Sequence, residues 1–186
     1  LNERDYPDSG LLCGGQVEIF VEPISEPRLI LFGGGHVSGA IARAARTVGF
    51  HVTVADERED FANDRAHPAA HEFLCGAFGR LAAGLADGPE PYVVVATPGH
   101  DQDRAVLQAL CEAGVRPRSL GMIGGQTKRV QVFDKLRAAG VGEAFLELVR
   151  TPMGLPIGAR THEEIAVSVV AEMIAARRLG AGPARA

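Results

Sequence analysis

Short apolar runs alternate with longer amphipathic stretches along most of the chain. The runs at residues 29–32, 52–55 and 92–96 are short, and each contains β-branched or bulky aliphatic side chains. Runs of this length are typical of parallel strands that are buried on both faces, and the stretches between them are long enough for helices. The pattern therefore predicts an α/β protein in which strands and helices alternate.

A glycine-rich turn and an amphipathic helix follow the first run. Gly33, Gly34 and Gly35 come directly after it, and apolar residues then recur at helical spacing at positions 37, 41, 44, 45 and 48. Strand, turn, helix and second strand in this order predict the βαβ unit of a dinucleotide-binding fold, in which the turn and the helix N-terminus bind a phosphate. In the fingerprint G-x-G-x-x-G, Ser38 stands at the third glycine position and Gly39 follows one residue late. The sequence therefore predicts the fold and leaves the ligand open.

The rest of the chain continues the alternation. Further strands are predicted at 71–75, 92–96 and 119–123, with helices at 78–86, after residue 99, through 130–136 and from 162 to 178. Thr161 and Glu164 have the spacing of a capping box at the start of the last helix. The fold class that we predict is α/β: a Rossmann-like, doubly wound, mainly parallel sheet with helices on both faces.

The first 27 residues do not fit this sheet. Residues 16–22 alternate polar and apolar side chains as a half-buried strand does, and Pro23 and Pro27 follow. We therefore expect residues 1–27 to be the end of a smaller N-terminal domain with its linker, 28–178 to form the Rossmann-like domain, and 179–186 to be a disordered tail. A chain that begins with Leu1 is compatible with a fragment of a longer protein.

Composition narrows the class of protein and of partner. The chain has 46% apolar and 23% charged residues, no apolar run near the ~20 residues that span a bilayer, and a net charge of −4. Nucleic acid and anionic membranes are therefore not expected partners. Three separate cysteines, Cys13, Cys75 and Cys111, indicate neither a disulfide framework nor a metal site. Together with the lack of a signal-peptide pattern, they favour a cytoplasmic location.

Polar residues and glycines gather where the predicted strands end. Because ligands of an open parallel sheet bind outside the carboxyl ends of its strands, we expect these segments to face one crevice. The candidate cofactor-binding residues there are Gly33, Gly34, Gly35, His36, Asp56, Arg58, Thr97, His100, Gly124 and Lys128.

Each candidate has a chemical role and a plainer structural alternative. Asp56 ends the second strand, where an acid can accept hydrogen bonds from a ribose. His36 and His100 are titratable groups near any ligand, but both also stand at predicted helix starts. Asp103 follows His100 at a spacing that also suits a helix cap. Lys128 suits either a phosphate clamp or a solvated helix face.

Cys13 lies beside Gly14 and Gly15, where a ligand could reach its thiol, but no activating base adjoins it. The alternative is a small buried side chain. The candidates for catalysis are Cys13, His100 and Asp103, and none of them is assigned a catalytic role.

With these segments in order, the chain resembles the XdhC/CoxI family of accessory proteins for molybdenum hydroxylases such as xanthine dehydrogenase. The resemblance covers almost the whole chain, and its most specific part is the segment 152–158, which no general Rossmann rule requires. The matching segments are 13–15 with the stretch to Pro23, 33–37, 56–58, 97–100 with Asp103, 121–124 with Lys128, 152–158 and 163–168.

The resemblance implies a protein that binds molybdenum cofactor, protects it while a cysteine desulfurase supplies the terminal sulfur, and hands it to a molybdenum hydroxylase. It also makes Cys13 a candidate contact for the cofactor or its sulfur. A homodimer is compatible with this role. Two alternatives stay open: an NAD(P)-dependent oxidoreductase with His100 as proton donor, and a nucleotide-sensing module. We favour a maturation factor over an enzyme.

Overall fold

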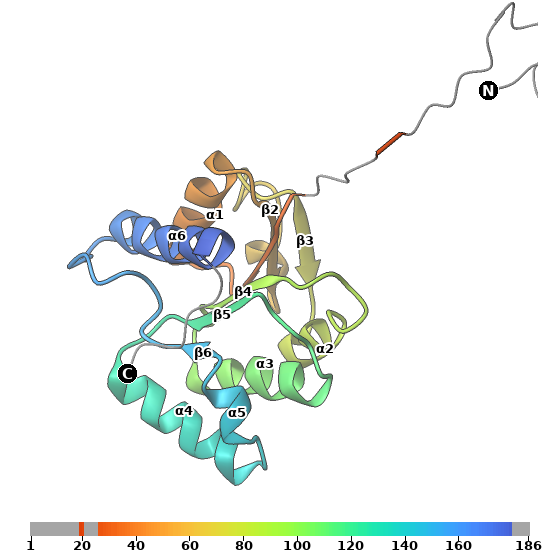
Figure 1. Cartoon of the computed structure of the whole chain (residues 1–186), viewed down its shortest axis with the longest axis vertical. Coiled ribbons are helices and arrows are strands. Elements are labelled where there is room, and N and C mark those ends of the chain that lie inside the picture. Colours follow the sequence, from red (N-terminus) through yellow and green to blue (C-terminus); the bar gives the residue numbers. More distant parts are fainter. Residues whose placement is uncertain (1–18, 21–25, 180–186) are drawn as a thin grey trace, which may run out of the picture.

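A six-stranded, wholly parallel sheet forms the centre of the computed structural model, which describes residues 19–20 and 26–179 (Figure 1). Its strand order is β3-β2-β1-β4-β5-β6. The strands are β1 (Arg28–Phe32), β2 (His51–Asp56), β3 (Glu72–Cys75), β4 (Tyr92–Val95), β5 (Ser119–Met122) and β6 (Val149–Arg150). Each neighbouring pair is parallel. The predicted Rossmann-like fold class is thereby confirmed.

The order of the strands reverses between β1 and β4. The chain runs outward from β1 to β3, then crosses to β4 on the other side of β1 and continues to β6. In such sheets the crevice for ligands opens outside the carboxyl ends of the strands near this switch point. Both strands at the switch are buried, because their side chains are covered on two faces.

Helices cover both faces of the sheet (Figure 1). On one face α1 (His36–Thr47) and α6 (His162–Leu179) pack against Leu29 and Leu31 of β1. On the other face Ile30 and Phe32 contact the layer of helices α2 (Phe78–Ala83), α3 (His100–Glu112), α4 (Gln126–Ala138) and α5 (Glu143–Leu146). The alternation of side chains along a strand explains why every residue of the run 29–32 is apolar.

The start of α6 confirms the predicted capping box. The backbone amide of Glu164 donates to Thr161 Oγ1 at 3.2 Å, and the amide of Thr161 donates to Glu164 Oε2 at 3.0 Å. Two amides at the helix start, which have no partner inside the helix, are thus satisfied. This fixes where α6 begins and so places its first residue, His162, beside α1.

Some sequence predictions differ from the structure or fall outside it. The 3-10 helix η1 (Glu59–Phe61), α5 and β6 were not predicted, and α2 ends at Ala83 instead of 86. The strand expected over 16–22 lies outside the described residues except for Ile19 and Phe20, which are exposed and not in a strand. Residues 1–18, 21–25 and 180–186 also lie outside them, and Leu179, the first residue of the expected tail, belongs to α6. Within the described range, no helix is long and apolar enough to cross a membrane.

Candidate functional site

The predicted site segments follow β1, β2, β4 and β5, so the fold brings all of them to the carboxyl edge of the sheet. There they form two hydrogen-bonded networks, and two cavities lie beside them. Their geometry decides which of the predicted residues face open space and which serve the fold.

The glycine turn after β1 is shaped by the protein's own backbone. Gly33 has a positive φ of 101°, and a Cβ on it would overlap the carbonyl of Ala96 after β4. A Cβ on Gly34 would overlap the carbonyl of Phe61. Glycine is therefore required at both positions by close backbone approach, whatever ligand is bound.

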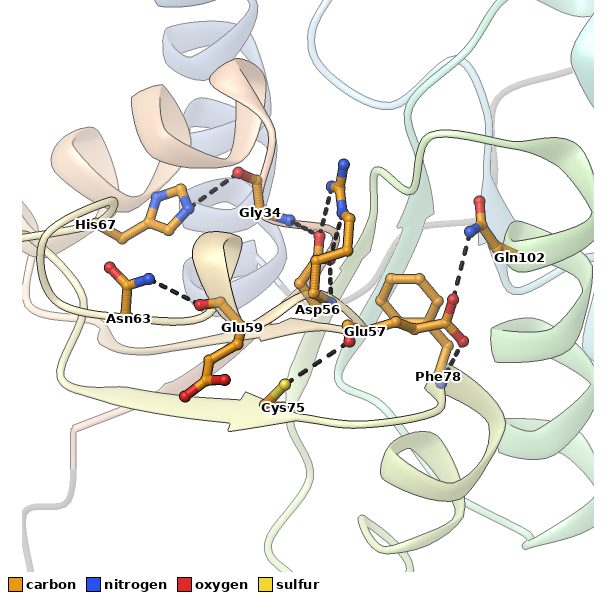
Figure 2. A network of polar contacts seen from close by, with 10 residues as sticks. Gly34, Asp56, Glu57, Glu59, Asn63, His67, Cys75, Phe78 and Gln102 are labelled. Atoms are coloured by element: carbon orange, nitrogen blue, oxygen red, sulfur yellow. Dashed lines mark hydrogen bonds and ion pairs between the residues drawn. The ribbon is translucent and has the colours of Figure 1, made fainter.

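Asp56 lies at the centre of the first network (Figure 2). Its carboxylate is 1% exposed and accepts the Gly34 amide at 2.7 Å, the Arg58 amide at 2.9 Å and two nitrogens of the Arg58 guanidinium at 2.9 and 3.0 Å. Burial acts to raise the pKa of this carboxyl, but the hydrogen bonds from Arg58 and Gly34 outweigh it. The net effect holds the pKa of Asp56 below its ordinary value of 3.8.

The loop after β2 folds back over the glycine turn. The guanidinium of Arg58 lies 3.6 Å from the centre of the Phe61 ring, and His67 Nε2 lies 3.0 Å from the carbonyl oxygen of Gly34. From the same loop, the carboxylate of Glu57 accepts the Phe78 amide at 3.3 Å and the Gln102 side chain at 3.4 Å (Figure 2). The loop is therefore tied to the glycine turn and to two helices.

Thr97, Asp103 and Lys128 form the second network. Asp103 is fully buried at the start of α3, where its carboxylate accepts the Thr97 hydroxyl at 2.7 Å and pairs with Lys128 Nζ at 2.6 Å. Lys128 also donates to the carbonyl of Ile123 at 3.0 Å, and its side chain runs so close to Gly124 that a Cβ there would overlap it. This buried ion pair joins the ends of β4 and β5.

Two of the plainer sequence alternatives fail for this second network. Gly99 is the cap residue of α3 and Asp103 points inward, so Asp103 is not the helix cap. Lys128 is 18% exposed, so it is not a solvated side chain. His100 occupies the first position of α3, is exposed, and is not part of the network.

A cavity of about 730 Å³ opens beside these networks, at the carboxyl ends of β5 and β6. The loop 150–159 forms one wall, residues 123–126 at the start of α4 form another, and Ile165, Ser168 and Glu172 of α6 close it. Of the predicted site residues that the structure describes, only Gly124 lines it.

Several polar groups that line this first cavity are buried. Arg150 and Glu172 pair at 3.5 Å, and Glu172 also accepts the Gly154 amide at 3.1 Å. The hydroxyl oxygen of Thr151 is buried and has no hydrogen-bond partner among the residues that the structure describes. The helix α4, whose first residue lines the cavity, has neither a side-chain cap nor an acid in its first turn, so its first amides have no side-chain acceptor there.

The loop 150–159 is held by tight packing. Met153 lies so close to Gly121 of β5 that a Cβ on the glycine would overlap its sulfur. Gly154 has a positive φ of 110° and packs against Ser168, and the Leu155 amide donates to the Ser168 carbonyl at 3.1 Å. Sequence reasoning did not name these residues as site residues. The signal that could have found them is the segment 152–158, the most specific part of the family resemblance.

A second cavity, of about 270 Å³, lies at the N-terminus of α1. Its lining comes from α1 and the turn before it, the loop after β2, and the start of α6; it consists of Gly34, Gly35, His36, Gly39, Arg43, Asp60, Phe61, Ala66, His67, His162 and Glu163. The rings of His36 and His162 stack with their centres 5.6 Å apart. The two cavities have no lining residue in common.

Neither cavity is lined by a cysteine that the structure describes. Cys13 lies outside the described residues, and of the cysteines within them Cys75 is exposed and Cys111 half-buried. In the described part of the chain, no group of three or more His, Cys, Asp and Glu side chains is placed to hold a metal ion.

Comparisons with known proteins agree on one family. Residues 29–173 match the family model of the XdhC Rossmann domain. An uncharacterised Escherichia coli protein, YqeB, is 37% identical over 165 residues, which cover 87% of this chain and 30% of that protein. A Bacillus subtilis protein described as a probable subunit of xanthine dehydrogenase is 30% identical over 158 residues, or 85% of this chain and 44% of the other.

A solved structure extends the likeness to three dimensions. A Bacillus halodurans protein described as a xanthine dehydrogenase superposes with a TM-score of 0.71 at 27% identity, over 83% of this chain and 43% of its own. The chain thus spans less than half the length of these relatives. Because the family model covers most of the sheet and its helices, the chain belongs to the XdhC Rossmann domain family.

Proposed function

We propose that this chain acts in the maturation of a molybdenum hydroxylase of the xanthine dehydrogenase type. In this proposal it binds molybdenum cofactor as cargo, protects it while a cysteine desulfurase supplies the terminal sulfur, and releases it to the hydroxylase. The family and the descriptions of the two Bacillus relatives support this direction.

The observation that carries the proposal is the first cavity. Its volume of about 730 Å³ lies within the range of about 300–1,000 Å³ that is usual for small-molecule sites. It is also built by the segment 152–158, which the general Rossmann pattern does not require. A cofactor-specific site is expected in such a segment, because the glycine turn is common to many unrelated functions.

The lining of this cavity fits a fused-ring compound with a phosphate. Met153, Leu155 and Ile165 offer apolar surface for the ring system. The first amides of α4 and the hydroxyl of Thr151 are donors without a side-chain acceptor among the described residues. A helix N-terminus of this kind favours a phosphate group. These residues would hold the cofactor by its organic part.

The geometry does not favour the NAD(P) alternative. A ribose bound at the end of β2 needs free lone pairs on Asp56, but four hydrogen bonds from Gly34 and Arg58 already occupy its carboxylate. A ribose would have to displace Arg58 from an almost fully buried carboxylate. We therefore propose pterin binding and not hydride transfer.

Direct binding tests the proposal. The full chain, handled without oxygen, is titrated with molybdenum cofactor and separately with NADH. We expect saturable binding of the cofactor only. Thr151→Val removes the buried hydroxyl at nearly constant volume and should weaken cofactor binding at least fivefold. Thr47→Val, on the exposed end of α1, is the matched control and should leave it unchanged.

Two outcomes contradict the proposal. The first is no saturable cofactor binding by the wild-type chain. The second is a target hydroxylase that receives its sulfurated cofactor normally in cells that lack this protein.

Cys13 needs a separate experiment, because it lies outside the described residues. We propose it as a contact for the cofactor or its sulfur, on the strength of its place in the family's Cys-Gly-Gly motif. Cys13→Ser should lower the amount of sulfurated cofactor bound, whereas Cys111→Ser, in α3, should not. If both variants bind equal amounts of sulfurated cofactor, Cys13 is not a contact for it.

A further inference from the structure

The second cavity contains a buried histidine with one unsatisfied nitrogen. His67 is 4% exposed, and its Nε2 lies 3.0 Å from the carbonyl oxygen of Gly34. A carbonyl oxygen only accepts, so Nε2 carries the hydrogen and donates it. In the neutral ring Nδ1 is then an acceptor. It is buried and has no hydrogen-bond partner in the described part of the chain.

The missing side chain of Gly39 leaves a space in front of this nitrogen. Gly39 belongs to α1, and a Cβ on it would lie 3.4 Å from His67 Nδ1 and 3.7 Å from Arg43 Nη1. Both nitrogens thus border one small space. The other terminal nitrogen of Arg43 donates to Glu163 at 3.2 Å, which helps to keep the guanidinium in place.

These two nitrogens restrict what the space can hold. Arg43 can only donate a hydrogen bond, whereas Nδ1 of the neutral His67 ring can only accept one. A group that bridges them must therefore accept from the first and donate to the second. A hydroxyl group does both. An anionic oxygen would leave Nδ1 unsatisfied unless the ring gained a proton.

The N-terminus of α1 lines the same cavity. The cap residue of α1, Gly35, provides no side-chain cap, and the first turn of the helix carries no acid. By contrast, α3 has two acids in its first turn and α6 has its capping box. The amides and the positive end of α1 therefore suit an external phosphate, next to the imidazole of His36.

The charges at the rim describe the rest of the ligand. Asp60 and Glu163 line the cavity, are exposed, and can accept hydrogen bonds from further hydroxyl groups. They disfavour a ligand that is anionic at both ends. The volume of about 270 Å³ is also smaller than is usual for drug-sized ligands, so the cavity suits a ligand smaller than a dinucleotide.

We propose that the second cavity binds a ribose phosphate, either free or as the sugar-phosphate part of a mononucleotide. One sugar hydroxyl bridges His67 Nδ1 and Arg43 Nη1 over Gly39, and the phosphate lies at the N-terminus of α1. Because the two cavities share no lining residue, this site is separate from the one proposed for molybdenum cofactor.

Calorimetric titration of the full chain tests this site with ribose 5-phosphate, inorganic phosphate and ribose. We expect ribose 5-phosphate to bind at least tenfold more tightly than either fragment. A titration with AMP distinguishes a nucleotide from a free sugar phosphate. If AMP binds more tightly than ribose 5-phosphate, the site is assigned to a nucleotide; if AMP binds more weakly, it is assigned to a free sugar phosphate.

The decisive variant is Gly39→Ala. Its methyl group occupies the position of the hydroxyl at ordinary contact distances, so the chain should fold, and its melting temperature should rise because alanine favours a helix. The affinity of this variant for ribose 5-phosphate should fall to its affinity for inorganic phosphate. Its affinity for inorganic phosphate should equal that of the wild type. Gly79→Ala in α2, where a Cβ meets nothing closer than 3.8 Å, is the control and should bind as the wild type does.

A second variant, Arg43→Met, removes the donor at an exposed position and should weaken the binding of ribose 5-phosphate at least fivefold. The proposal is wrong if the wild type shows no saturable binding of ribose 5-phosphate or no preference for it over inorganic phosphate. It is also wrong if Gly39→Ala raises the melting temperature without changing affinity, because the space would then hold only water. None of these results bears on the binding of molybdenum cofactor.

Discussion

The amide of Gly34 donates a hydrogen bond to the carboxylate of Asp56 at 2.7 Å, which joins the turn after β1 to the end of β2 (Figure 2). In a dinucleotide-binding domain both groups are expected to contact the ligand. Here each satisfies the other, and Arg58 completes the arrangement from the loop that covers the turn. Two residues that the sequence marks as ligand contacts therefore serve first to hold the carboxyl edge of the sheet together.

Lowering the pH should destabilise the folded protein, because it protonates Asp56. The pKa of this carboxyl in the folded protein lies below its ordinary value of 3.8, so the charged form is the one that the fold stabilises. That stabilisation is fully present above about pH 5 and is lost as the pH falls through the folded pKa. Urea unfolding from pH 7 to pH 2 should therefore show a loss of stability that is smaller in Asp56→Asn.

At pH 7 the same variant should lower the free energy of unfolding by about 2 kcal/mol, because a buried hydrogen-bonded carboxylate is replaced. Asp64→Asn, at an exposed position in the covering loop, is the control and should behave as the wild type. Identical pH profiles for wild type and Asp56→Asn would show that this network does not stabilise the fold.

Lys128→Met should destabilise the protein by about 3 kcal/mol, because it leaves the fully buried carboxylate of Asp103 without its cation. The double variant Asp103→Leu/Lys128→Met should recover part of this loss, since a buried ion pair can be replaced by apolar side chains of similar size. Denaturant unfolding measures both changes.

The control for this pair is Lys135→Met, because the side chain of Lys135 is half exposed and that of its partner Asp101 is largely exposed. Its effect should be much smaller, because water screens the pair. If Lys135→Met and Lys128→Met lower the free energy of unfolding equally, burial does not explain the contribution of the second network to stability.

Gly121→Ala should destabilise the protein by about 2 kcal/mol, because the new methyl group overlaps the sulfur of Met153. The loop 150–159 would move and the first cavity would change shape, so binding of molybdenum cofactor should weaken as well. Adding Met153→Ala makes room for the methyl group. A double-mutant cycle should therefore show that the two substitutions together cost less than the sum of each alone.

Thr161→Ala should lower the free energy of unfolding by about 1 kcal/mol, because it removes the hydroxyl that accepts the Glu164 amide at the start of α6. Thermal unfolding measures the change. Thr47→Ala is the matched control, since its hydroxyl donates to a carbonyl near the end of α1 and caps no helix start. Equal melting temperatures for Thr161→Ala and wild type would contradict a stabilising cap.

The sequence by itself determined the local elements and their order. Leu29 to Phe32 had to form a strand covered on both faces, because every side chain in the run is apolar. Thr161 and Glu164 marked a helix start because a capping box needs only four consecutive residues. The elements η1, α5 and β6 escaped prediction, because each has at most four residues and none is a wholly apolar run such as that of β4.

Only the tertiary structure decided what the polar residues do. Asp56 has the same sequence position whether it binds a ribose or the Gly34 amide, and the choice depends on the covering loop, whose path no local pattern specifies. Both cavities likewise arise where α6 meets segments far from it in sequence, residues 123–126 at the first cavity and the start of α1 at the second. Hydrophobic periodicity is a property of neighbouring residues, whereas a site is a property of contacts between distant ones, and for that reason the fold could be predicted while the cavities could not.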